Sequence, residues 1–185
     1  MGCGCGKKKT GTIHFMGEAN TDPADPVEWG PVVWKYLHIV AEKLGTTGNN
    51  IVNADLANYY ETLITTLHLI LPCTECQAHT AAYIASNPFP SLKTLPPDVQ
   101  RLTARIWLFN FHNYVRASKG QQIMVVSPDE CPAIYSNGFV PKCEYTYFVK
   151  SVAYAVSQGW VRVDIWRKWY SNSERVRILA GNIVT

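Results

Sequence analysis

The sequence predicts an all-α fold: four helices, a short fifth helix that ends near residue 160, and an extra C-terminal segment. In the predicted helices, apolar residues recur every three or four positions, whereas the alternation typical of strands persists nowhere. Prolines and glycines separate these segments, as they do at helix ends. The 185 residues are 47% hydrophobic and 17% charged, a composition that is typical of a folded domain.

The first helix is expected to begin at Pro26, because proline is favoured in a first helical turn and Glu28 suits the same turn. Its apolar residues form two adjacent stripes, so the helix is predicted to be well buried. One stripe holds Trp29, Val33, Leu37, Val40 and Leu44, and the other holds Trp34, His38 and Ala41. Packing alone would explain Trp34 and His38, with His38 bonded to a backbone carbonyl. Asn53 is a candidate cap for the next helix.

The second and third helices are expected on either side of Pro72. The residues at helical spacing before it are Leu56, Tyr60, Leu63, Leu67 and Ile70. They predict a buried helix that runs into Pro72, where the proline breaks it. Helical spacing then resumes and continues to Asn87, where Pro88 ends the third helix.

A Cys-x-x-Cys motif, Cys73 to Cys76, lies in the expected first turn of the third helix, and His79 follows it. Unpaired N–H groups and the positive end of the helix dipole stabilise a thiolate there, which favours thiol–disulfide exchange. A zinc site is the alternative, but Cys131 and Cys143 are 12 residues apart and form no second knuckle. A thioredoxin-type site would need βαβ patterning, which the helical flanks lack. Two ordinary core cysteines are the remaining alternative.

The fourth helix is expected to begin at Pro97, after a proline-rich loop over residues 87–97. The string from Trp107 to Asn113 is dense in aromatic residues and ends in two polar side chains, His112 and Asn113. Polar groups at a buried position need partners, and a ligand could supply them. The alternative is that His112 is a core histidine bonded within the protein.

Residues 120–143 are predicted to form a loop, because prolines and glycines recur along them. Cys131 and Cys143 bracket its end, and a structural disulfide between them is favoured over two free thiols. A fifth helix follows and ends at Gly159. Whether the tail from Trp160 adds a helix or covers a surface is left open.

The first residues, 1–9, consist mainly of glycine, cysteine and lysine and are not expected in a core. Gly2 suggests N-myristoylation, with Lys7–Lys9 as an electrostatic second signal for a membrane. Cys3 and Cys5 could instead shuttle electrons, because a disulfide closed over one residue is strained and oxidising. A tail with incidental cysteines is the third interpretation. We favour the shuttle.

Charge and length exclude several classes of function. The net charge of +3 is too small to indicate nucleic-acid binding, and no apolar run is long enough to cross a bilayer. No signal peptide is recognised, so an intracellular protein is expected. The six cysteines form three sequence-close pairs, which indicates redox work in such a setting. No metal is expected.

Three motifs in a set order carry a family resemblance. They are Trp29-Gly30-x3-Trp34-x3-His38, Cys73-x-x-Cys76-x-x-His79 and Trp107-x4-His112-Asn113-x-Val115, and an aromatic helix closes the series. In this order they resemble the Erv/ALR family of FAD-linked sulfhydryl oxidases, most of all the versions carried by large DNA viruses. The resemblance covers roughly residues 26–160.

The resemblance implies a four-helix bundle with a short fifth helix around FAD, usually as a homodimer. Cys76 would be the thiol nearest the flavin, and Cys73 the outer thiol that exchanges with an incoming dithiol. The residues that would contact FAD are Gly30, Trp34, His38, Cys76, His79, Tyr83, Trp107, His112, Asn113 and Val115. The aromatic ones would offer stacking faces to the flavin and the adenine.

The chain departs from the family at several positions. Pro31 replaces the family's arginine after the first-helix glycine, and Arg116 replaces an asparagine, so the phosphate contacts would fall to Arg116 and Lys119. The family's cysteine just before the His-Asn string is missing, and Cys131–Cys143 would substitute for its structural disulfide.

The resemblance therefore implies an FAD-dependent thiol oxidase that forms disulfides in protein dithiols, a thioredoxin-like carrier among them. Electrons would pass through the Cys-x-x-Cys pair and FAD to O2, which becomes hydrogen peroxide. A viral protein of this kind would work in the host cytoplasm or the virion. The expected organisation is a flexible arm (1–25), the oxidase domain (26–160) and a C-terminal extension (161–185). The alternatives are a lipid-anchored, non-enzymatic helical protein and a zinc-binding module.

Overall fold

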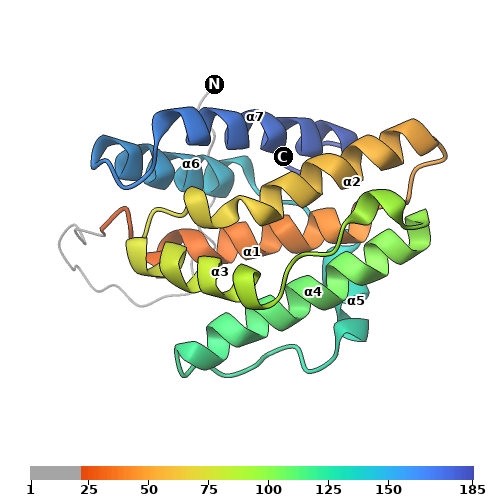
Figure 1. Ribbon diagram of the computed structural model, residues 1–185, viewed down its shortest axis with the longest axis horizontal. Helices are drawn as coiled ribbons and strands as arrows, with labels where there is room; N and C mark the ends of the chain where they lie inside the picture. The colour runs from red at the N-terminus through yellow and green to blue at the C-terminus, as the bar shows by residue number, and fades with distance from the viewer. Residues whose placement is uncertain (1–21) are drawn as a thin grey trace, which may run out of the picture.

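The structure, a computed structural model, describes residues 22–185 and confirms the all-α prediction. Within that range no β-strand forms, and only an isolated bridge joins Val140 to Val184. Figure 1 shows the arrangement of the helices. The α-helices are α1 (Pro26–Lys43), α2 (Asn50–Thr65), α3 (Thr74–Ser86), α4 (Pro97–Ser118), α5 (Cys131–Tyr135), α6 (Lys142–Ser157) and α7 (Val163–Leu179). Three short 3-10 helices are η1 (Leu67–Leu69), η2 (Leu92–Thr94) and η3 (Pro128–Glu130).

Helix α1 is the central element, because it packs against α4, α5 and α6. It begins at Pro26 as predicted, and the side chain of Asp25 caps it by accepting the N–H of Val27 at 2.9 Å. The two apolar stripes explain its central position, since a helix that is apolar on adjacent faces can bury both. Leu37 and Val40 on this helix are fully buried.

A buried ion pair fixes α1 against α4. Arg105 on α4 donates from Nε and Nη2 to the two carboxylate oxygens of Glu42 on α1, each at 2.7 Å. Glu42 is only 4% exposed, so water does little to weaken the contact. This pairing sets the register that brings the two histidine-bearing stretches of α1 and α4 face to face.

Helix α2 is shorter than the spacing of the apolar residues predicted. It ends at Thr65, and the chain continues through η1 to Pro72, so the apolar positions 67 and 70 are buried by a 3-10 turn and the residue after it. The cap is Asn49, whose side chain accepts the N–H groups of Ile51 and Val52. Asn53, the cap predicted, lies within the first turn.

The segment predicted as a loop, 120–143, contains a short helix that the sequence analysis did not predict. Ser127 caps η3, and α5 follows it directly, packed against α1. Helix α6 then begins at Lys142, and Gly159 follows its end at a positive φ of 74°, as expected for a glycine at a helix C-terminus.

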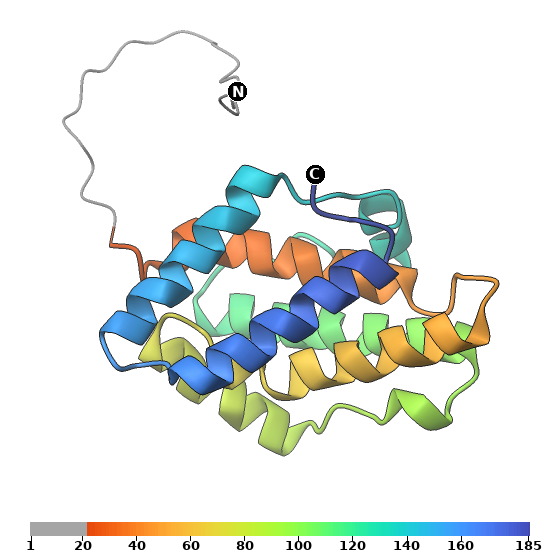
Figure 2. The same ribbon diagram turned by 90° about the horizontal axis from the view of Figure 1, so that it is seen from above.

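The C-terminal segment forms a further helix, α7, which lies alongside α2 (Figure 2) and also meets α6. Its contacts are buried: Trp169 donates from Nε1 to the carbonyl of Leu63 at 3.2 Å. Tyr36 on α1 donates to the carbonyl of Ser173 at 2.8 Å. Helix α7 therefore contributes to the same core as the other helices.

In the part of the chain that the structure describes, no helix combines the length and the apolarity needed to cross a membrane.

Candidate functional site

A cavity of about 700 Å³ opens between α1, α3, α4 and the α5 segment. Its volume falls in the range of about 300–1,000 Å³ that is usual for small-molecule sites. The predicted site residues that line it are Gly30, Trp34, Cys73, Cys76, His79, His112, Val115, Arg116 and Lys119. The three sequence motifs, far apart along the chain, therefore meet at one cavity.

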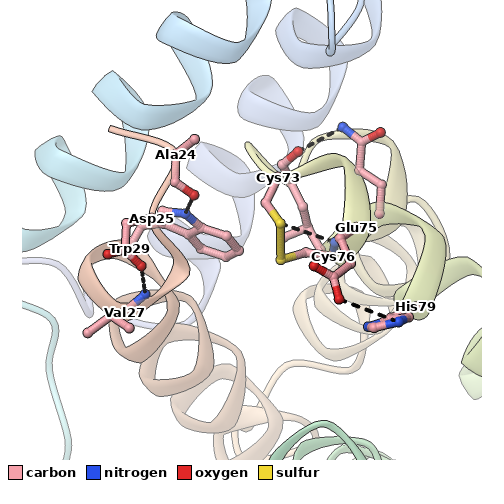
Figure 3. The surroundings of a disulfide bond; sticks show 10 residues. Ala24, Asp25, Val27, Trp29, Cys73, Glu75, Cys76 and His79 are labelled. Carbon is pink, nitrogen blue, oxygen red and sulfur yellow. Dashed lines mark hydrogen bonds and ion pairs between the residues drawn. A yellow bond between two sulfur atoms is a disulfide. The ribbon is translucent and has the colours of Figure 1, made fainter. Parts of the chain in front are cut away.

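A disulfide between Cys73 and Cys76 lies in the wall of this cavity, with the two Cα atoms 5.1 Å apart (Figure 3). Cys73 is the N-cap of α3, and its Sγ accepts the backbone N–H of Cys76 at 3.2 Å. Both sulfur atoms therefore lie at the N-terminus of the helix, as predicted. The N–H groups and dipole there would stabilise a thiolate once the disulfide is reduced.

Trp29 on α1 faces the disulfide, as Figure 3 shows, and lines the cavity. Its indole Nε1 donates to the carbonyl of Ala24 at 3.0 Å, which fixes the ring plane. Trp29 was predicted as part of a core stripe and as the first residue of the first family motif, but not as a residue that contacts FAD. The signal for its second role is the spacing to Trp34, which places both rings toward one end of the same helix.

Aromatic rings from three helices form a stack at the other side of the cavity. Trp34 on α1 stacks on His112 of α4, with ring centroids 4.1 Å apart and an angle of 6° between the planes. His38 stacks on Tyr135 of α5 at 4.5 Å and 10°. The two pairs are joined by a hydrogen bond of 3.1 Å between Nε2 of His38 and Nδ1 of His112.

Both histidines of this stack are neutral at neutral pH. Burial, and then the neighbouring His112, lower the pKa of His38 to about 3. Burial, and then the charge of Arg116, lower the pKa of His112 to about 4. Each ring therefore offers one N–H donor and one bare nitrogen acceptor.

Three cationic side chains line the cavity, and they come from two helices. Arg116 lies in the last turn of α4, and Lys119 is the C-cap of that helix. Arg116 donates from Nε to the carbonyl of Gln122 at 2.8 Å. Lys35 on α1 is the third, and its ammonium lies 5.6 Å from the ring centre of Phe139. Lys35 was not among the residues predicted from the sequence. Its signal was its position one helical turn after Pro31, on the same face as the family's missing arginine.

A histidine–glutamate pair lies next to the disulfide. His79 Nε2 is 3.9 Å from an oxygen of Glu75, one turn earlier on α3 (Figure 3). The side chains are 49% and 80% exposed, so water screens the pair and it adds little stability. Both residues line the cavity, where they place polar groups near Cys76.

The structure places four predicted contact residues behind the lining. His38 contacts two lining residues, His112 and Tyr135, and the others support the wall. Tyr83 stacks on Phe111, a lining residue, with centroids 4.7 Å apart. Trp107 donates from Nε1 to the carbonyl of Asn87 at 2.9 Å.

Asn113, the fourth of these residues, makes its contact with the segment after α4. Its amide donates to the carbonyl of Val125 at 3.4 Å. Asn113 therefore holds that segment beside α4, next to Arg116, which bonds to the same segment at Gln122.

The expected disulfide between Cys131 and Cys143 is not formed, and this prediction is wrong. Cys131 is a buried free thiol at the start of α5. Burial first, then the charge of Glu42, raises its pKa to about 11. Cys143 lies exposed in the first turn of α6. The short helix α5 turns Cys131 inward toward α1, which the loop predicted for this segment did not anticipate.

Cys3, Cys5 and Gly2 lie outside the described residues. Among the described residues, no group of three or more His, Cys, Asp or Glu side chains is arranged to hold a metal ion.

Comparisons with known proteins agree with this arrangement. The profile of the Erv1/Alr family matches residues 31–132, more than half of the chain. An FAD-linked sulfhydryl oxidase from a Kenyan isolate of African swine fever virus is 31% identical over 124 residues, which cover 64% of this chain and 89% of that protein. The protein of the same name from a Namibian isolate is 30% identical over 124 residues, with the same coverage. No solved structure gives a significant match.

Proposed function

The chain belongs to the Erv1/Alr family and is an FAD-dependent thiol oxidase, and we propose that it acts through the disulfide between Cys73 and Cys76. The observation that carries this proposal is the position of the disulfide. It lies at the N-terminus of α3 and in the wall of a cavity large enough for a cofactor.

The residues that line the cavity fit FAD. Trp34 and Trp29 bring aromatic rings to the lining, where a flavin or adenine ring would bind, and Lys35, Arg116 and Lys119 offer positive charge to a diphosphate. The lining also provides imidazole groups for hydrogen bonds to the polar edges of such rings. A bound FAD would supply the redox chemistry, namely the transfer of the electron pair of the reduced cysteines to O2 with formation of hydrogen peroxide.

Thiol–disulfide exchange at the two cysteines accounts for the oxidation of the substrate. A substrate thiolate attacks Sγ of Cys73, the Cys73–Cys76 bond breaks, and Cys76 leaves as a thiolate. The N–H groups at the start of α3 stabilise that negative charge. The second substrate thiolate then attacks the mixed disulfide, so the substrate leaves oxidised and both cysteines are reduced. The two substrate protons pass to these cysteines and to solvent.

We propose a set of residues that hold the cofactor. Those in the lining are Gly30, Trp34, Lys35, Cys76, His79, His112, Val115, Arg116 and Lys119, and those that support it from behind are His38, Tyr83, Trp107 and Asn113. Gly30 has open space beside it, because a Cβ atom there would meet nothing within 4 Å. A side chain at this position would occupy part of the cavity.

Protein dithiols are the substrates of this activity. A thioredoxin-like carrier suits exchange at Cys73, and Cys3 and Cys5 are proposed to relay electrons from such a protein. We propose that the protein is a homodimer and that it works in the host cytoplasm or the virion. The same proposal divides the chain into an arm (1–25), an oxidase domain (26–160) and an extension (161–185). The motifs and the viral relatives support it.

The test is a visible absorption spectrum of the pure protein, followed by an oxygen-electrode assay with dithiothreitol. A bound flavin should make the protein yellow, and oxygen consumption should match the hydrogen peroxide formed. A colourless protein that consumes no oxygen after incubation with FAD would contradict the proposal. A variant with Gly30→Leu provides a second test, since its side chain should exclude FAD from a folded protein.

A further inference from the structure

Glu75 is the charged residue of the Cys-x-x-Cys motif, and it directly precedes Cys76. Its side chain is 80% exposed and lines the cavity together with both cysteines. Figure 3 shows its carboxylate beside the disulfide and directed toward His79. The exchange of thiols described above gives this carboxylate no role, although every incoming thiol must approach it.

The charge of Glu75 is not cancelled by a lysine or an arginine. Within residues 22–185 its one ion-pair partner is His79, at 3.9 Å, and an imidazole cancels the charge only while it is protonated. The cations of the lining are Lys35, Arg116 and Lys119, which a bound diphosphate would neutralise. With the cofactor in place, the carboxylate therefore leaves negative charge next to the disulfide.

This charge matters because thiol–disulfide exchange brings further charges to the same place. A substrate thiolate attacks Sγ of Cys73 and the bond to Cys76 breaks; a second thiolate then releases the first as a disulfide, and both cysteines are reduced. The carboxylate repels the reacting sulfur of every thiol alike. It also acts on any other charge near that sulfur, because it attracts a cation and repels an anion.

We propose that Glu75 is a specificity-determining residue, which makes the disulfide prefer thiols with a positive charge beside the sulfur and discriminate against anionic thiols. The substrates that fit are protein dithiols flanked by lysine or arginine. Glutathione, the abundant small thiol of reducing compartments, carries a net negative charge and is disfavoured, so the enzyme oxidises less of it. The inference rests on the proposed function in one respect, namely that thiols exchange at this disulfide.

The first experiment compares three small thiols: cysteamine, which is cationic, 2-mercaptoethanol, which is neutral, and glutathione, which is anionic. The rate at which each thiol reduces the holoenzyme is followed without oxygen, at low salt, by the loss of flavin absorbance. The full chain carries Cys3→Ser/Cys5→Ser, so that these two thiols cannot exchange with the disulfide. Each thiol is compared between Glu75→Gln and the chain with Glu75, so its intrinsic reactivity cancels.

Relative to 2-mercaptoethanol, glutathione should react about twofold to threefold faster with Glu75→Gln, and cysteamine slower by the same factor. This is the size of one charge–charge interaction across roughly 7 Å of water. Glu75→Lys should enlarge both changes, since it reverses the charge, and about 1 M salt should largely remove them by screening. Asp55→Asn, which removes an exposed carboxylate outside the lining, is the matched control and should leave the ratios unchanged.

The second experiment uses two peptides of equal length with the same pair of cysteines, flanked by lysine in one and by glutamate in the other. Oxygen consumption at low salt should give a kcat/KM roughly fivefold higher for the lysine peptide. Glu75→Gln should reduce this preference, and Asp55→Asn should keep it.

Ratios that are the same in Glu75→Gln as with Glu75, or that change equally in Asp55→Asn, would overturn the proposal. If the protein binds no flavin, the proposed function fails, and the same ratios are then measured by alkylation of the freed cysteines and mass spectrometry. A disulfide that none of the three thiols reduces would overturn both the proposed exchange and the role of Glu75.

Discussion

Cys73 has two roles that follow from one position in the chain. As the N-cap of α3 it accepts the N–H of Cys76, and it is also bonded to the sulfur of that residue. After reduction, the Cys73 thiol can still cap the helix, so opening the disulfide need not disturb α3. The site can therefore pass between its oxidised and reduced forms without rebuilding its wall.

Alanine at either cysteine should abolish the oxidation of dithiothreitol while FAD stays bound, because the exchange needs both sulfur atoms. In Cys73→Ala the remaining Cys76 thiolate should add a long-wavelength charge-transfer band to the flavin spectrum. Oxygen consumption and visible absorption measure the two effects. Activity near that of the wild type in either variant would contradict the proposed exchange.

Lys35 should contribute to FAD binding through its charge. Lys35→Gln should weaken FAD binding by roughly fivefold to tenfold at low salt, and the difference should shrink as salt screens the charge. Lys35→Arg should keep most of the affinity. Lys150→Gln, an exposed lysine on α6 outside the lining, is the control for a change of net charge. A loss that is independent of salt, or equal in Lys150→Gln, would count against a direct role.

Cys131 should behave as a free thiol in the purified protein. Its burial raises its pKa to about 11, so it should resist alkylation at pH 8 in the folded state and react once the protein is unfolded. Peptide mass spectrometry after unfolding without a reductant should find Cys131 alkylated. A disulfide-linked peptide pair of Cys131 and Cys143 would refute the structure at this point.

At the scale of helices, the cavity depends on how α1 and α4 are joined. The ion pair of Glu42 and Arg105 is buried and makes two short hydrogen bonds. Burial also makes the ion pair sensitive to mutation, since removal of one partner leaves the other charge buried without a counter-charge. The pair therefore fixes the register of the site more than it adds to stability.

Arg105→Met alone should lower the free energy of unfolding by about 3–5 kcal/mol, because Glu42 then stays buried and unpaired. The double variant Glu42→Leu/Arg105→Met should recover much of this loss, since it replaces both charges by apolar groups. Urea unfolding followed by circular dichroism measures both. A double variant that is less stable than Arg105→Met would show that the pair itself is strongly stabilising.

The sequence was sufficient to predict α1, α4 and the start of α3, because long apolar stripes, Pro26, Pro97 and Pro72 are local signals. It could not predict the end of α2. The spacing of Leu67 and Ile70 continues the pattern, since a 3-10 turn buries positions three residues apart much as an α-helix does.

The cavity and its cations could be predicted only in part. The motifs and the family resemblance named nine of the lining residues. Lys35 lies beside Trp34 on α1 and was overlooked, whereas Tyr135 joins the site through its contact with His38, which is far from it in the sequence. Likewise, the spacing of Cys131 and Cys143 allows a disulfide, and only the packing of α5 against α1 decides against it. The periodicity of apolar residues indicates which face of a helix is buried, but it does not indicate which element packs against that face.

At the scale of the whole molecule, α7 completes the core on the side away from the cavity. Tyr36 and Tyr145 both bond to Ser173, which is fully buried, so α1, α6 and α7 share one polar contact inside an apolar core. The family profile ends at residue 132, before α6 and α7. These last helices pack against α1 and α2 and so stabilise the bundle in which the family's motifs are held.

A last prediction concerns Cys3 and Cys5, which lie outside the described residues and whose role stays a prediction from the sequence. A small dithiol can reach Cys73 directly, whereas a folded protein is bulky and would profit from an intermediate carrier. Deletion of residues 1–9 should therefore spare dithiothreitol oxidation and slow the oxidation of reduced thioredoxin at least several-fold. Cys3→Ser/Cys5→Ser in the full chain should reproduce the deletion, because the relay depends on the two thiols. If both rates are unchanged, the segment is not a shuttle, and membrane flotation of Gly2→Ala then separates an acyl anchor from an idle tail.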